Sequence, residues 1–290
     1  MGLNVTDYKS LSFYDARHLL REWRTKHTRE SEVTLEVWEN VLGRSQSSLD
    51  DELWPILEQV CVAALDCSRQ DVAVLCIQQL SEKFKGSNRV RRLQAMQLES
   101  LGKWQEAQKM YEILRVEDDK NTPLYEKRLI AIAKSKGNTE EAISLIGEHL
   151  KTYLNDVEAW LELSELYFGE KDLLKGIHCL EELMLSHPHN PVYFRRLAEA
   201  RYTLGGNDNL VAAKKYFQHS LESNPNDLRS SLGLYLTEQQ LAGGKQPGSK
   251  TPASEPSDAL QKCIIILEKA QQHGNAPNHV PIIEALATLG

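Results

Sequence analysis

The 290-residue sequence predicts an all-α fold in which about five to six helical hairpins stack into a solenoid. The first observation is a recurring pattern of a small residue, three spacers and a bulky apolar residue, at intervals of 34, 35, 34 and 37 residues. The second is a set of Gly, Asn and Asp clusters that interrupt the apolar periodicity where hairpin turns are expected. The recurring pairs are Ala73/Ile77, Ala107/Tyr111, Ala142/Ile146, Gly176/Leu180 and Ala213/Phe217.

One repeat shows the pattern most completely. Trp160, Leu163 and Tyr167 share one helical face, and small Gly176 lets the second helix approach the first closely. Pro188 cannot continue that second helix and predicts the turn into the next repeat. This pattern and the 34-residue period are typical of tetratricopeptide repeats. We therefore expect a tetratricopeptide superhelix, with the Trp160 ring buried in its core.

The pattern divides the chain into three parts. Residues 1–49 are expected to form N-terminal capping helices, residues 50–227 five tetratricopeptide repeats, and residues 228–290 C-terminal helices. Within the last part, a stretch near 243–257 is rich in Gly, Pro, Ser and Lys and lacks aliphatic residues, so it predicts a disordered loop.

The N-terminal part allows more than one interpretation. Ser12 and Asp15 resemble a capping box that opens a helix, and a second helix is expected from Ser31 to Leu42. Three arginines flank the apolar stripe of the first helix, which fits either a cap on the first repeat or contact with an anionic membrane surface. Residues 1–6 also fit the short N-myristoylation pattern.

Composition indicates an ordinary soluble protein. Hydrophobic residues make up 41% and charged residues 26%, and the net charge of -7 argues against a nucleic-acid partner. The longest aliphatic run, at residues 263–267, is far shorter than the ~20 residues of a membrane span. A cytoplasmic protein is expected, with Cys61, Cys67, Cys76 and Cys179 as reduced core residues.

Known catalytic signatures are missing from the sequence. It contains no GxGxxG, GxxxxGK[ST], HExxH or GxSxG motif. His178, His187 and His189 cluster in sequence, but their spacing is that of a polar turn and does not resemble paired metal ligands. We expect no enzyme activity, no cofactor and no metal site.

A partner surface is predicted on the first helix of each hairpin, because these helices line the inner face of such a superhelix. Its charges come in blocks, which either form a solvated face or set the register of a protein partner. The candidate partner-binding residues are Arg89, Arg92, Lys127, Arg128, Glu158, Glu162, Glu165, Arg195 and Arg196. The positions where a co-chaperone carboxylate clamp would carry Asn hold Val62, Met96, Ala131, Glu165 and Glu199, so that clamp is not expected.

Several runs extend the similarity beyond the generic repeat. They lie between residues 13 and 241, and the joined run from 158 to 190 is the most specific: Glu58–Val60, Ala63–Asp66, Gly86–Leu93, Glu158–Tyr167, Cys179–Met184 and Pro188–Asn190. The sequence resembles the family of subunit 2 of the endoplasmic reticulum membrane protein complex.

That resemblance implies a non-catalytic cytosolic scaffold, peripheral on the cytosolic face of the endoplasmic reticulum. Such a scaffold would support insertion of tail-anchored and other weakly hydrophobic transmembrane segments. Its expected partners are the membrane subunits of the complex and a soluble subunit of metalloprotease-like fold. The alternative is a free tetratricopeptide adaptor that binds a peptide or a C-terminus in its groove.

Overall fold

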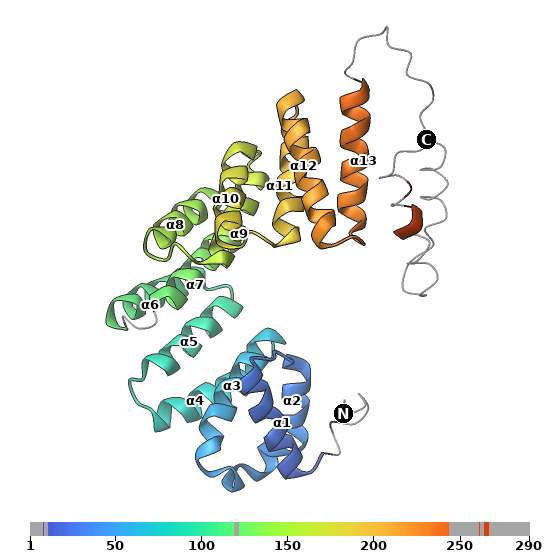
Figure 1. Cartoon of the computed structure of the whole chain (residues 1–290). Helices are drawn as coiled ribbons and strands as arrows, with labels where there is room; N and C mark the ends of the chain where they lie inside the picture. The colour runs from blue at the N-terminus through green and yellow to red at the C-terminus, as the bar shows by residue number, and fades with distance from the viewer. Residues whose placement is uncertain (1–7, 9–10, 119–121, 244–260, 262–263, 267–290) are drawn as a thin grey trace. The chain divides into compact units, whose positions relative to one another are not determined.

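The computed structural model describes residues 8, 11–118, 122–243, 261 and 264–266. Every regular element among these residues is a helix, which confirms the predicted all-α fold (Figure 1). The chain forms two compact units, Met1–Leu145 and Ile146–Gly290, here called unit 1 and unit 2. Each unit is described by itself.

Unit 1 begins with two helices and two short 3₁₀ segments, followed by paired helices. Its elements are α1 (Phe13–Lys26), α2 (Ser31–Asn40), η2 (Leu42–Ser48), η3 (Asp50–Glu52), α3 (Leu53–Asp66), α4 (Gln70–Lys83), α5 (Asn88–Ser100), α6 (Trp104–Glu117) and α7 (Thr122–Ser135). Helix α8 (Thr139–Thr152) crosses the boundary between the two units.

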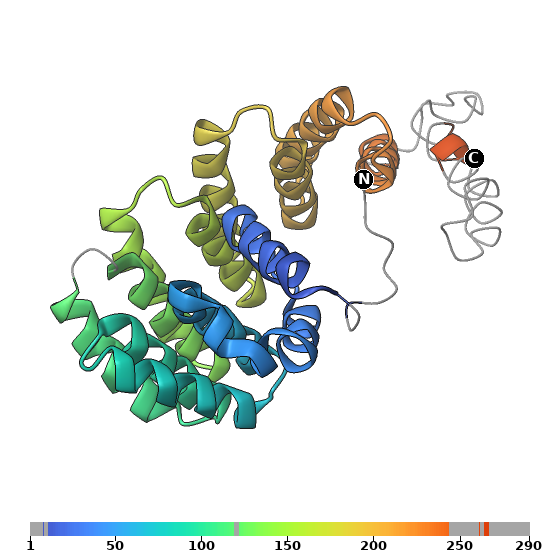
Figure 2. The same cartoon turned by 90° about the horizontal axis from the view of Figure 1, so that it is seen from below.

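Unit 2 continues the alternation of first and second helices. Its elements are α9 (Val157–Gly169), α10 (Leu173–Ser186), α11 (Pro191–Leu204), α12 (Asn207–Ser223) and α13 (Leu228–Gly243). Within each unit, the two helices of a hairpin lie side by side, as α3 and α4 or α11 and α12 do (Figure 1 and Figure 2). The division into caps, five repeats and C-terminal helices remains a prediction beside these observed bounds.

The N-terminal helices follow the sequence closely, with one shift. The Asp15 N–H donates to Ser12 Oγ at 3.2 Å, so Ser12 caps α1 as expected. The second helix ends at Asn40 and not at Leu42, because Val41 leaves the helical region with φ of -120°. Buried Leu42 then opens the 3₁₀ segment η2.

The recurring small and bulky positions form the core. All five small residues are buried, and so are their bulky partners: Ile77, Tyr111, Ile146, Leu180 and Phe217. Gly176 shows why a small residue is needed, since a Cβ atom there would lie 2.2 Å from a ring carbon of Phe168. The periodicity therefore identified the residues on which the hairpins pack.

In four of the described hairpins the turn uses one residue in the left-handed region, whereas the turn between α11 and α12 has positive φ at both Gly205 and Gly206. In the four single-residue turns φ is 59° at Ser68, 71° at Gly102, 74° at Gly137 and 63° at Lys171. This shared backbone explains why Gly and small polar residues recur between paired helices.

Trp160 is half-buried, so the expectation of a fully buried ring was wrong. Its indole N–H donates to the Leu154 carbonyl at 2.8 Å and fastens the turn before α9. We expect Trp160→Ala to lower the free energy of unfolding by about 1–2 kcal/mol, because it loses part of the apolar burial and one hydrogen bond. Urea unfolding monitored by circular dichroism measures this. A loss as large as that of Leu163→Ala, at a position only 6% exposed, would contradict it.

Two expectations fall largely outside the described residues. These are the acylation pattern at residues 1–6 and the loop near 243–257, of which only residue 243 is described, as the end of α13. Of the C-terminal segment, Ile264 packs against the cluster around Phe217 and Tyr235. None of the helices in the described ranges has both the length and the hydropathy needed to cross a membrane.

Candidate protein-interaction surface

In unit 1, ion pairs join each first helix to the next. Arg89 and Arg92 on α5 both bind the carboxylate of Glu58 on α3, with Arg92 Nη2 at 2.8 Å from Oε1. The two arginines thus share a single carboxylate. They tie α5 to α3 along the face where the sequence predicted a partner.

The next link in unit 1 is a triad in which Tyr111 and Glu99 are buried and Arg128 is partly exposed. Arg128 on α7 donates from Nε to Glu99 Oε1 at 2.9 Å, and the Tyr111 hydroxyl on α6 donates to the same carboxylate. Burial, together with the adjoining Glu99 carboxylate, raises the pKa of Tyr111 well above its usual range. Burial alone would lower the pKa of Arg128, but Glu99 and Tyr111 outweigh it and raise it. The triad therefore links the three helices α5, α6 and α7 through one carboxylate.

Unit 2 repeats this arrangement with other residues. Arg196 on α11 pairs with Glu165 on α9 at 2.9 Å, and Arg229 on α13 pairs with Glu199 on α11 at 3.0 Å. These links again join successive first helices. In each pair one side chain is largely exposed, Glu165 in the first and Arg229 in the second. Each ion pair therefore contributes little to stability by itself.

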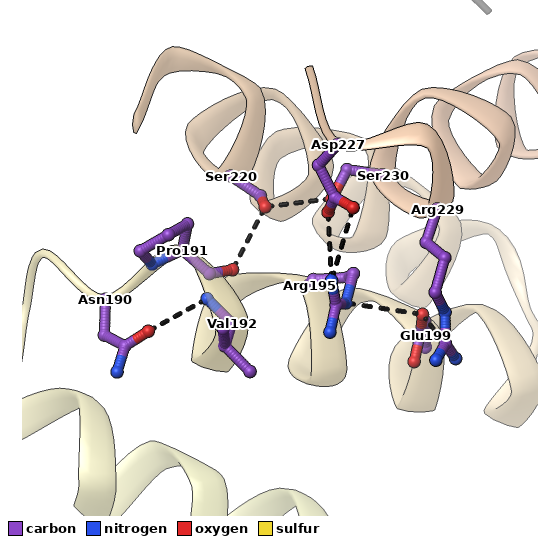
Figure 3. A network of polar contacts seen from close by, with 9 residues as sticks. All are labelled: Asn190, Pro191, Val192, Arg195, Glu199, Ser220, Asp227, Arg229 and Ser230. Carbon is purple, nitrogen blue, oxygen red and sulfur yellow. Dashed lines mark hydrogen bonds and ion pairs between the residues drawn. The ribbon is translucent and has the colours of Figure 1, made fainter. Parts of the chain in front are cut away.

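Arg195 makes the most enclosed link in unit 2. Its Nη1 lies 3.2 Å from Asp227 Oδ2, and the same carboxylate accepts a hydrogen bond from Ser230 (Figure 3). Ser220 on α12 donates to the Pro191 carbonyl, which adds the second helix of the hairpin to the network. Because Arg195 serves this network, its replacement would disturb folding and would be a poor probe of a partner.

The predicted surface residues are largely tied to neighbouring helices. Most of them form ion pairs with a residue about one repeat away: Arg89, Arg92, Arg128, Glu165, Arg195 and Arg196. Lys127 lies on α7, and Glu158 and Glu162 lie on α9. The blocks of like charge in the sequence are therefore largely balanced in space by neighbouring helices.

Sequence reasoning missed the acidic partners. Glu58, Glu99 and Asp227 were not among the candidates, although each lies 29 to 34 positions from the arginine that it pairs with. Opposite charges separated by roughly one repeat length were the available signal.

The cysteines of the described residues are free thiols. Burial raises the pKa of Cys61 and of Cys76 to about 12, so both thiols are protonated at neutral pH. Cys67 is only half-buried and is not part of the deep core expected from the sequence. In the described part of the chain, no three His, Cys, Asp or Glu side chains gather as metal ligands would.

Comparison with known proteins gives the context of this surface. A family described as "EMC2 TPR-like repeat domain" matches residues 74–221. The chain is 39% identical over 246 residues to ER membrane protein complex subunit 2 of Xenopus tropicalis, covering 85% of this chain and 82% of the relative. The chain belongs to the ER membrane protein complex subunit 2 family. The resemblance stated from the sequence is confirmed.

The chain is also similar to proteins of an amoeba and a yeast. The Dictyostelium discoideum subunit 2 is 35% identical over 218 residues, covering 74% of this chain and 67% of the relative. The TPR repeat protein oca3 of Schizosaccharomyces pombe is 32% identical over 224 residues, covering 77% and 79%. Among solved structures, the C-terminal part of a TPR repeat-containing protein from Cytophaga hutchinsonii has a TM-score of 0.60 at 15% identity, covering 90% of this chain and 97% of that one. That likeness supports the tetratricopeptide fold.

Proposed function

We propose that this chain is a non-catalytic scaffold subunit of the ER membrane protein complex, peripheral on the cytosolic face of the endoplasmic reticulum. The observation that carries the proposal is its 39% identity to a named subunit 2 over 85% of the chain. The aligned residues span both units of the chain. This favours a role shared with the relative by the whole fold, because similarity in a single repeat would cover only one hairpin.

The ion-pair links suit a scaffold. Glu58, Glu99 and Asp227 each tie a first helix to its neighbour, so helices that carry partner contacts keep their spacing. A partner that contacts several repeats then meets a surface that loses little conformational entropy on binding. In this role the chain holds membrane subunits and a soluble subunit of metalloprotease-like fold. It thereby supports insertion of tail-anchored and other weakly hydrophobic segments.

Removal of the chain from cells tests this role. We expect the remaining subunits to lose their assembly, and insertion of a tail-anchored reporter with a weakly hydrophobic segment to fall. A reporter with a strongly hydrophobic segment serves as the matched control and should insert normally. An intact, fully active complex without this chain would contradict the proposal.

A further inference from the structure

A small apolar cavity lies in unit 1 between α3, α4 and α5. The cavity has a volume of about 150 Å³, and its apolar lining includes Trp54, Leu80, Phe84, Val90 and Leu93. The Trp54 and Phe84 rings meet edge to face, with centroids 5.4 Å apart, and Phe84 is 40% exposed at the mouth. A dry cavity of roughly 150 Å³ accommodates a benzene-sized group. This Trp54 cavity can therefore receive one aromatic or branched aliphatic side chain from outside.

A second, wider hollow adjoins it. Trp23, Arg24 and His27 from the α1 end line this Arg24 hollow, together with Arg92 from α5. Pro55, Glu58 and Arg89 line both the hollow and the Trp54 cavity. The two depressions are therefore neighbours, separated by the Glu58–Arg89 pair.

Cations outnumber the carboxylates available to them around this pair. Arg89 and Arg92 share the Glu58 carboxylate, and the Arg89 side chain is 72% exposed. Arg29, also in the lining, is already paired with Asp66, and Glu30 is the other acid there. The Arg24 hollow thus keeps an excess of positive charge.

Arg24 is the clearest sign of that excess. It donates from Nη1 to the neutral Gln59 amide oxygen at 2.9 Å and forms no ion pair with a carboxylate of the described residues. Burial, with repulsion from Arg21, lowers the pKa of Arg24. A partly desolvated guanidinium without an anion is a favourable place for an incoming carboxylate.

We propose that this surface binds an acidic peptide segment whose neighbouring apolar side chain enters the Trp54 cavity. The carboxylates would meet Arg24, Arg89 and Arg92, and the apolar anchor would pack against Trp54 and Phe84. The proposal does not depend on membership of the complex, because every residue that carries it belongs to unit 1 of this chain.

Fluorescence anisotropy with the purified full-length chain tests this. The probe is a short labelled peptide with one leucine followed by a run of glutamates. Two matched peptides replace the glutamates by lysines or the leucine by alanine. We expect the acidic peptide to bind more tightly than both, with an affinity that falls as salt is raised.

Three variants locate the binding. Arg24→Gln removes the cation that is hydrogen-bonded to Gln59, and Phe84→Ala opens the cavity wall. Each should weaken binding of the acidic peptide by roughly fivefold or more. Lys109→Gln changes an exposed charge on α6 and should leave the affinity unaltered. Circular dichroism confirms that each variant is folded.

Several outcomes would overturn the proposal. These are equal affinity for the acidic and basic peptides, no acidic-peptide binding by the wild type, or unchanged affinity in both Arg24→Gln and Phe84→Ala. Phosphatidylserine vesicles form a separate arm of the experiment. Arg24-dependent binding to vesicles without binding to the peptide would assign the surface to a membrane and also overturn the proposal.

Discussion

Glu99→Ala is expected to lower the free energy of unfolding by about 3 kcal/mol, because it removes the buried acceptor that Tyr111 and Arg128 share. Arg128 would keep a partly buried positive charge without its carboxylate. The fully buried Tyr111 hydroxyl would lose its acceptor at the same time. Urea unfolding followed by far-ultraviolet circular dichroism measures the loss.

Two further variants separate the triad from a general loss of charge. Tyr111→Phe removes only one hydrogen-bonding group from the triad and should cost about 1 kcal/mol. Glu112→Ala, at an exposed position on the same helix as Tyr111, should stay within about 0.5 kcal/mol of the wild type. If Glu99→Ala were no more destabilising than Glu112→Ala, the triad would not hold α5, α6 and α7 together.

Phe217→Ala is expected to lower the free energy of unfolding by about 3–5 kcal/mol, because the Phe217 ring is buried at the centre of a core cluster of unit 2. Its loss leaves a cavity beside Ala198, Ala213 and Leu234. Amide hydrogen exchange in α12 and α13 should rise together with the fall in the urea midpoint. Unchanged protection of both helices would contradict this packing.

Gly233 offers a matched test of the same cavity. A Cβ atom there would lie 2.3 Å from the end of the Phe217 ring, so Gly233→Ala alone crowds the core. In the Phe217→Ala background that methyl group has room, and alanine also favours the helix by about 1 kcal/mol over glycine. We expect the double variant to be more stable than Phe217→Ala. If it is less stable, Gly233 does not face the ring.

The apolar frame could be predicted from the sequence because it depends on residue size at fixed spacing. Ala107 and Tyr111 are both fully buried, and Ala213 and Phe217 occupy the same places in a later hairpin. Trp160 shows the limit of such reasoning. Its apolar ring fits the repeat pattern, but the ring is half-exposed and its N–H donates to the Leu154 carbonyl in the turn before α9.

The polar surface was harder to predict because its contacts are made between repeats. The sequence shows that Arg128 lies on a first helix, but only the packing of α5 beside α6 and α7 brings Glu99 and Tyr111 to it. The Arg24 hollow was missed for the same reason. It combines α1, α3 and α5, and no single repeat contains it.

The composition of the native assembly tests the scaffold role most directly. The tagged chain can be isolated from detergent-solubilised cells and its co-purifying proteins counted by quantitative mass spectrometry. We expect the membrane subunits of the ER membrane protein complex to be present in amounts equal to this chain. If the chain is instead recovered free of those subunits, with only sub-stoichiometric partners that a peptide displaces, it is an adaptor and the scaffold account is contradicted.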